Sequence, residues 1–242
     1  MRKLSSVLFV TCVWFLASCH YFGGEMVRGN GVLQAQERSI SDFKGVSVAG
    51  NMQVVLVPGS VYNVRVEADE NLLPYIETEK EGDVLVIAPQ KGYNLRPRTD
   101  MKIYVTAPVI NEVEVVGSGK VESQGRLTAD RRLKTDVTGS GDVKLEVDAP
   151  EVAAEITGSG NISLSGNTRK FRAEITGSGD LMGFDLLSET TDVEISGSGN
   201  AQVFASKQLG IDIHGSGNVD YKGSPGSINQ DVAGSGKVRK VQ

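Results

Sequence analysis

Apolar and polar residues recur along residues 109–242 with a regular period, and the tripeptide Gly-Ser-Gly marks each copy. The residue two positions before the first glycine is β-branched in every copy, and the residues four and six positions before it are mostly apolar. Because these positions alternate with polar ones, the pattern predicts a strand with one buried face in each copy. The first glycines of the copies are Gly117, Gly139, Gly158, Gly177, Gly197, Gly215 and Gly234.

A second short strand is predicted four residues after each first glycine, where the residue is again apolar. The two glycines favour a tight turn between the strands, since glycine adopts positive φ without a steric cost. Each copy then forms one coil of two strands and two turns. The sequence therefore predicts an all-β fold for residues 109–242, a single-chain parallel β-solenoid with coils of about 19 residues.

Residues 40–108 are also rich in strand-like segments but are less periodic. The stretch Val46–Val57 predicts a strand, a turn and a strand, and its Ala49-Gly50-Asn51 is similar to a degenerate repeat turn. We expect this segment to be continuous with the solenoid and to form its N-terminal β cap. A separate small β domain is the alternative.

The first 18 residues have the pattern of a secretory signal, because Arg2 and Lys3 precede an apolar run too short for a stable membrane span. The run ends in Leu16-Ala17-Ser18-Cys19, which resembles the lipobox of bacterial lipoproteins. This resemblance implies a lipid on Cys19, and an ordinary signal peptide cut nearby is the alternative. Residues 19–39 predict a flexible tether. His20 stands where an aspartate would favour the inner membrane, so we expect an outer-membrane lipoprotein, on either face.

Composition narrows the classes of function. The net charge of −5 provides no basic surplus for phosphate contacts, so we expect no nucleic-acid partner. Two cysteines and two histidines argue against a Cys/His zinc site, and we predict neither a metal nor a cofactor. After lipidation of Cys19 the mature chain keeps no thiol nucleophile, and the sequence offers no histidine and acid set to activate a repeat serine.

The position three residues before each first glycine is acidic in every copy and lies on the outward side of the predicted strand. In register, neighbouring carboxylates would stand ~4.8 Å apart and repel by about 0.9 kcal/mol in bulk water. The row is either a solvated edge that opposes aggregation or a linear site for divalent cations or a basic partner. A catalytic pair is disfavoured, because a flat row offers no means of separating the carboxyl pKa values. This acidic row consists of Glu114, Asp136, Glu155, Glu174, Glu194, Asp212 and Asp231.

A second candidate binding surface is the segment 90–98, which is basic in an otherwise acidic chain. Irregular loops on rigid scaffolds often bind partners, so Lys91, Tyr93, Arg96 and Arg98 are candidate contact residues, with an ordinary solvated loop as the alternative. The Asn and Asp residues that stand three positions after most first glycines are predicted to stabilise the turns.

These features together resemble the putative adhesin family with the head GIN domain, which occurs mostly in lipoproteins and secreted proteins of Bacteroidetes. The resemblance rests on the stretches Asp42–Gly50 and Asp69–Thr78 and on the Gly-Ser-Gly copies, and it spans roughly residues 40–225. It implies an all-β, solenoid-like domain and an adhesin role. It supplies no catalytic or binding residues.

The favoured hypothesis for the function is a non-enzymatic lipoprotein of the cell envelope that adheres to, or assembles with, an unknown protein or glycan. A homo-oligomer is compatible with this hypothesis. The alternative is a β-helix carbohydrate-active enzyme. The uniformity of the repeats, and the loss of Trp14 with the signal, argue against the enzyme.

Overall fold

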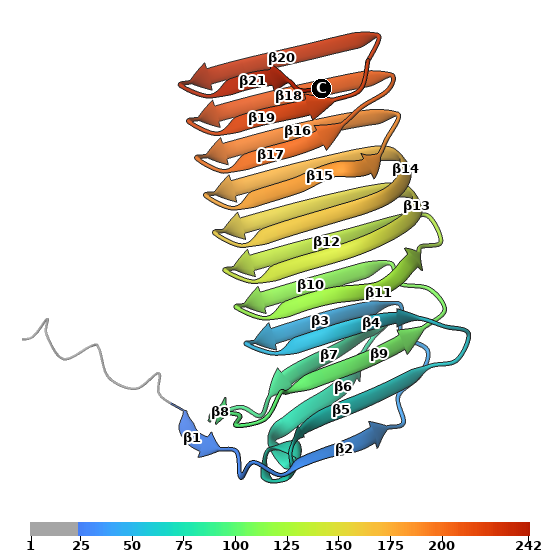
Figure 1. The fold of residues 1–242 in the computed structure, drawn as a ribbon, viewed down its shortest axis with the longest axis vertical. Coiled ribbons are helices and arrows are strands. Elements are labelled where there is room, and N and C mark those ends of the chain that lie inside the picture. The colour runs from blue at the N-terminus through green and yellow to red at the C-terminus, as the bar shows by residue number, and fades with distance from the viewer. Residues whose placement is uncertain (1–23) are drawn as a thin grey trace, which may run out of the picture.

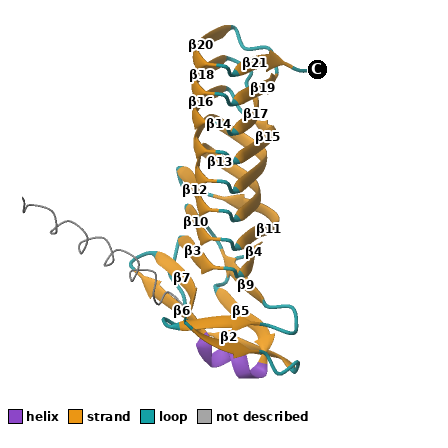
Figure 2. Cartoon of the chain, turned by 90° about the vertical axis from the view of Figure 1, so that its left-hand side faces the viewer, coloured by secondary structure: helices purple, strands orange, loops and turns teal. Residues whose placement is uncertain are grey.

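The computed structural model describes residues 24–242, and these residues form a narrow column of stacked strands (Figure 1). Each coil places one strand in a first sheet and one strand in a second sheet, and the two sheets face each other across the core (Figure 2). Successive coils pair in parallel. The predicted all-β parallel solenoid is therefore confirmed.

The strands divide into three groups. The first sheet contains β7 (Val84–Pro89), β3 (Gly45–Gly50), β10 (Glu112–Gly117), β12 (Arg132–Gly139), the second halves of β13 (Asp142–Gly158) and β14 (Asn161–Gly177), β16 (Thr190–Gly197), β18 (Gln208–Gly215) and β20 (Ser227–Gly234). The second sheet contains β9 (Lys102–Ala107), β4 (Gln53–Pro58), β11 (Lys120–Thr128), the first halves of β13 and β14, β15 (Asp180–Leu187), β17 (Asn200–Phe204), β19 (Asn218–Lys222) and β21 (Lys237–Lys240). The N-terminal end adds β1 (Glu25–Arg28), β2 (Leu33–Arg38), β5 (Asn63–Asp69), the 3-10 helix η1 (Glu70–Tyr75), β6 (Ile76–Glu81) and β8 (Tyr93–Arg96).

The strand register aligns the repeats column by column. Ile156 of β13 is paired with Ile175 of β14, and Ile175 is paired with Ile195 of β16. All three side chains are at most 1% exposed. The inward column that the sequence predicts therefore forms a continuous apolar core as far as β18, whereas β20 of the last coil is exposed.

The Gly-Ser-Gly turns are stacked as closely as the strands. Gly158 has a φ of 120°, which favours glycine, and a Cβ atom placed there would lie 2.5 Å from the carbonyl oxygen of Gly139. The backbone N–H of Ser159 donates to that same oxygen at 2.8 Å. Glycine is thus required both for the backbone conformation and for the close approach of consecutive coils.

Residues 40–108 share the sheets of the repeat region. Strands β3 and β4 pair in parallel with β10 and β11, and Gly50 lies in register with Gly117. Beyond them β5 lies antiparallel to β9, β2 lies antiparallel to β5, and η1 lies at this end of the column (Figure 2). The parallel stack therefore ends in antiparallel strands and a short helix.

Residues 25–38 are not the flexible tether that the sequence predicts. Strand β1 pairs with β8, and β2 pairs along its whole length with β5, from Leu33 opposite Asp69 to Arg38 opposite Val64. The partners lie far along the chain, so local composition gives no sign of this order. The remaining tether residues 19–23 and the signal segment 1–18 lie outside the described residues.

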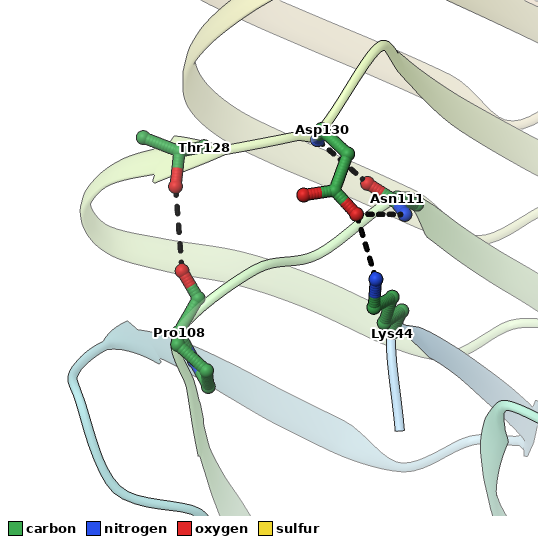
Figure 3. Close-up of polar contacts among 5 residues, drawn as sticks. All are labelled: Lys44, Pro108, Asn111, Thr128 and Asp130. Carbon is green, nitrogen blue, oxygen red and sulfur yellow. Dashed lines mark hydrogen bonds and ion pairs between the residues drawn. The ribbon is translucent and has the colours of Figure 1, made fainter. Parts of the chain in front are cut away.

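Polar contacts join the N-terminal cap to the first repeat coils (Figure 3). The Lys44 ammonium donates to the Asp130 carboxylate at 2.7 Å, and the Asp130 backbone N–H donates to the Asn111 side-chain oxygen at 3.0 Å. The hydrogen bond from Lys44 to Asp130 and the negative charge of Asp130 raise the pKa of Lys44. Hydrogen bonds from Lys44 and Asn111 in turn lower the pKa of Asp130. Both charged side chains are about half exposed, so the pair orients the segments more than it stabilises them.

A buried carboxylate fastens the β1–β2 turn to the rest of the cap. Asp69 is inaccessible to solvent and accepts hydrogen bonds from the backbone N–H groups of Gly31, Arg98 and Thr99 at 2.6, 2.9 and 3.1 Å. Burial alone raises the pKa of Asp69, but these donors outweigh burial and the net pKa is lowered. Asp69 is therefore an ionised carboxylate whose hydrogen bonds hold three segments together.

We expect Asp69→Asn to lower the free energy of unfolding by about 2 kcal/mol at pH 7, because the amide nitrogen would face backbone donors. A lowered folded-state pKa contributes stability above the unfolded value, about 3.9, and this contribution is lost as the pH falls through the folded pKa. Urea unfolding should show a smaller gap between wild type and variant at pH 3 than at pH 7. The exposed control Asp100→Asn should have little effect at either pH. If the stability difference between wild type and Asp69→Asn were the same at both pH values, the structural role of an ionised Asp69 would be contradicted.

Candidate binding surfaces

The acidic row is in register along the first sheet, as the sequence predicts. Consecutive members are directly paired from Glu114 and Asp136 at one end to Asp212 and Asp231 at the other. Each of the first six members lies beside a buried residue of the inward column, so their carboxylates point to the outer face of the sheet, whereas Asp231 lies on β20, which is exposed along its whole length. At its N-terminal end, the Ser47 hydroxyl donates to Glu114 at 2.6 Å.

Two cations lie across the row and reduce its repulsion. The Lys134 ammonium lies 3.0 Å from Asp136 and 3.9 Å from Glu155, and the Arg172 guanidinium lies 3.6 Å from Glu194. The hydrogen bond to Asp136 raises the pKa of Lys134. The row is therefore a mixed-charge strip from β12 to β16, and on β18 the His214 imidazole lies 3.2 Å from Asp212.

The carboxylates of the row are not equivalent, which differs from the expectation for a flat row. The side chain of Asp136 is only 13% exposed, whereas that of Glu155 is 48% exposed. Burial is the main cause that raises the pKa of Asp136, and the negative charge of Glu155 adds to it, while Lys134 opposes both. Burial can thus raise the pKa of a carboxyl group even on an open sheet.

A shallow hollow of about 360 Å³ lies on the first sheet between β14 and β20. It forms where Gly210 contributes no side chain between Asp192 and Asn229, and its walls include Glu194, Asp212 and Asp231. Within residues 24–242, no group of three or more His, Cys, Asp or Glu side chains is placed to hold a metal ion. The hollow is thus an open, acidic depression on a strand face.

We expect Glu155→Gln, Glu174→Gln and Glu194→Gln together to change the free energy of unfolding by no more than about 0.5 kcal/mol, because charge repulsion and surface ion pairs are removed at no packing cost. Millimolar calcium should shift the melting temperature of the wild type no more than monovalent salt at matched ionic strength. Differential scanning fluorimetry of both chains measures this. A calcium-specific rise that the triple variant loses would instead establish a cation site.

The basic segment is a strand rather than an irregular loop. Residues Tyr93–Arg96 form β8, which pairs with β1 along one edge. The Tyr93 ring packs against the Tyr75 ring, with 4.6 Å between the ring centroids. Lys91, Arg96 and Arg98 remain exposed. Figure 1 places β8 near the N-terminal end of the column. The basic segment therefore lies apart from most of the acidic row.

The Asn and Asp side chains of the turns form hydrogen bonds between coils as well as shaping the turns. The Asn161 amide donates to Asp142 at 2.8 Å, the Asn200 amide donates to Asp180 at 2.9 Å, and the Asn218 amide donates to Asn200 at 2.9 Å. These ladders support the structural role that the sequence predicts for this column.

A second hollow, of about 410 Å³, lies on the second sheet and was not predicted. The register between β14 and β15 shifts after Ser163, and this bulge brings Phe184 to the rim, where the Lys222 ammonium lies 5.0 Å from its ring. Ser163 and Ser165 also line the hollow. The only sequence signal for this hollow is that Ser163 and Ser165 are small, whereas other copies of the repeat carry larger residues at these positions.

Comparison with known proteins identifies the family. Residues 42–225 match the family described as "Putative auto-transporter adhesin, head GIN domain", and the chain belongs to this family. The resemblance drawn from the sequence is therefore confirmed. No curated protein matches the chain.

Solved structures show the same fold. One from Parabacteroides distasonis, called a putative lipid binding protein, is 27% identical with a TM-score of 0.72, and the match covers 90% of this chain and 100% of that one. A putative adhesin from Parabacteroides merdae is 25% identical with a TM-score of 0.70 and the same coverage. A putative adhesin from Bacteroides fragilis has a TM-score of 0.83 at 19% identity, covering 89% and 100% of the two chains, and this likeness concerns the fold alone.

The proposed lipidation site cannot be placed on this fold, because Cys19 lies outside the described residues. In the part of the chain from residue 24 onward, no helix is long and apolar enough to cross a membrane.

Proposed function

We propose that the protein is a non-enzymatic adhesive module of the bacterial cell envelope that binds its partner through the acidic row of the first sheet. The observation that carries the proposal is the row itself, a continuous, in-register series of outward carboxylates on a rigid sheet. Such a surface matches a partner that carries regularly spaced basic groups, because complementary charge gives specificity and fast association. Membership of an adhesin family supports the same class of function.

The proposed location is the outer membrane, with the chain held by a lipid on Cys19. The lipobox-like Leu16-Ala17-Ser18 and the absence of aspartate at position 20 support this proposal. We expect Cys19→Ala to move the chain out of the detergent-dependent membrane fraction. Retention of that variant in the fraction after signal cleavage would contradict lipid anchoring.

One observation favours the alternative of a carbohydrate-active enzyme. Burial raises the pKa of Asp136, which lies beside Glu155, and glycoside hydrolysis uses a pair of carboxyl groups of which one has a raised pKa. Both carboxylates lie on an open strand face, however, and neither lines the hollow on that sheet. This geometry gives a substrate no enclosure, so binding without turnover is better supported.

The test measures binding and turnover with the same samples of the full chain. The probes are a glycan array and surfaces coated with polylysine or polyglutamate, and released reducing sugar is assayed in parallel. We expect binding to polylysine that falls at least tenfold in the Glu155→Gln, Glu174→Gln and Glu194→Gln variant. The control variant Glu146→Gln, Asp148→Asn and Asp185→Asn removes three carboxylates elsewhere and should bind as wild type. Equal losses in both variants would refute a role for the row, and sugar release that requires Asp136 would establish the enzyme.

A further inference from the structure

Strands β1 and β8 form a separate two-stranded parallel sheet beside the N-terminal end of the column (Figure 1). Its inner face carries Val27, which packs on the core, and Leu95, which is 2% exposed. Because side chains alternate along a strand, Met26 and Arg28 of β1 point to the opposite, outer face, as does Arg96 of β8. We call this the outer face of the β1–β8 sheet.

The outer face is basic and its charges are not compensated. Arg28 lies directly opposite Arg96 in the strand register, and both are exposed. Like charges directly opposite each other destabilise a strand pair unless an anion lies between them. Within residues 24–242, neither arginine forms an ion pair, and the same is true of the nearby exposed Lys91 and Arg98. In the described part of the chain, four cations at one end of an acidic protein thus have no ion-pair partner.

Exposed apolar side chains accompany these cations. Met26 is 53% exposed on the outer face itself, and Val32 and Leu33, in the turn and strand that follow, are 54% and 56% exposed. Large apolar residues beside unpaired basic residues are the combination that binds at the interface of an anionic bilayer, because headgroup phosphates attract the cations and the apolar groups enter the acyl boundary.

The outer face is held in a fixed position. The Glu25 backbone N–H donates to the Gly92 carbonyl at 2.7 Å, and the Gly29 backbone N–H donates to the Arg96 carbonyl at 2.9 Å. The Asn71 side-chain amide donates to the Arg28 carbonyl at 2.8 Å. The arginines are therefore presented from ordered strands, so little backbone entropy is lost when they bind.

The chain length before β1 places this face close to the anchor. Gly24 follows Cys19 by five residues, a span of at most roughly 18 Å. If Cys19 carries a lipid, as the proposed function holds, the β1–β8 sheet cannot move far from the bilayer. The acidic row lies on other strands and would be repelled by an anionic surface, so the charge distribution also favours approach by this end.

We propose that the outer face of the β1–β8 sheet docks on anionic phospholipid headgroups of the membrane that holds the chain. Arg28 and Arg96 bind the phosphates, with Lys91 and Arg98 at the margin, and Met26 enters the interface. This proposal rests on the lipid anchor of the proposed function, which supplies the proximity. Docking would orient the column with its N-terminal end on the membrane.

The test uses the full lipidated chain in vesicles of phosphatidylcholine, with or without phosphatidylglycerol. A polarity-sensitive dye is attached to Met26→Cys, and the control is the same dye at Val61→Cys, an equally apolar exposed site in the loop between β4 and β5 on the other side of the column (Figure 1). We expect a blue shift at residue 26 that requires phosphatidylglycerol, and none at residue 61. Arg28→Gln with Arg96→Gln should lower the ratio of docked to undocked chains about fivefold for each arginine removed. The control Arg131→Gln with Arg169→Gln should leave the ratio unchanged.

The outcomes separate this proposal from the proposed function. A chain that floats with phosphatidylcholine vesicles but shows no phosphatidylglycerol-dependent shift keeps its anchor and refutes docking. Docking is also refuted if the dye at residue 26 shows the same blue shift in the Arg28→Gln with Arg96→Gln variant as in the Arg131→Gln with Arg169→Gln control. A chain that does not float with phosphatidylcholine alone lacks the anchor. In that case, docking is supported if vesicles with phosphatidylglycerol retain the wild-type chain and do not retain the Arg28→Gln with Arg96→Gln variant. Docking is refuted if these vesicles do not retain the wild-type chain.

Discussion

Ile175→Asp is expected to lower the free energy of unfolding by about 5 kcal/mol or more, which is comparable to the whole stability of many domains. Ile175 is 1% exposed and lies between Ile156 and Ile195 in the central inward column. A carboxylate there would have no counter-ion in the core, and its neighbours in both adjoining coils would lose their apolar contact. The loss would spread along the stack, since each coil is stabilised by the next.

The matched control for this experiment is Thr176→Asp, which introduces the same residue one position further along β14. Thr176 is exposed, so the control should stay within about 0.5 kcal/mol of the wild type. Urea unfolding followed by far-ultraviolet circular dichroism measures both variants. Similar losses in the two chains would contradict the assignment of alternate residues to core and solvent.

Gly158→Ala should lower the free energy of unfolding by about 4 kcal/mol. The added methyl group would lie 2.5 Å from the carbonyl oxygen of Gly139, which accepts the hydrogen bond from the N–H of Ser159. The φ of 120° adds a conformational penalty for any L side chain. Relieving the contact requires the two coils to separate at the turn, which weakens hydrogen bonds on both sides.

Gly82→Ala separates the two causes in the same assay. Gly82 also has a positive φ, 60°, but a Cβ atom there would meet no atom within 4 Å. It should therefore show the conformational penalty alone, about 1 kcal/mol. A loss as large in Gly82→Ala as in Gly158→Ala would show that backbone conformation, rather than the close stacking of turns, explains the glycine column.

The repeat region could be predicted from the sequence because its determinants are local and recur in every coil. Alternation of apolar residues specified which side of each strand is buried, as at Ile156 and Ile175. The glycines of each copy specified where the chain turns. A constant period then brings equivalent residues into register, so the acidic row from Glu114 to Asp231 followed from spacing alone.

The tertiary structure alone decided the features that depend on distant partners. Strand β2 has no burial pattern of its own and is ordered by pairing with β5, and β8 is a strand because β1 lies against it. The burial of Asp69 arises from three segments meeting, and the raised pKa of Asp136 arises mainly from its burial. The pairing of Arg28 with Arg96, which are 68 residues apart, has the same origin. Sequence patterns record local periodicity, whereas these features depend on which distant segments come into contact.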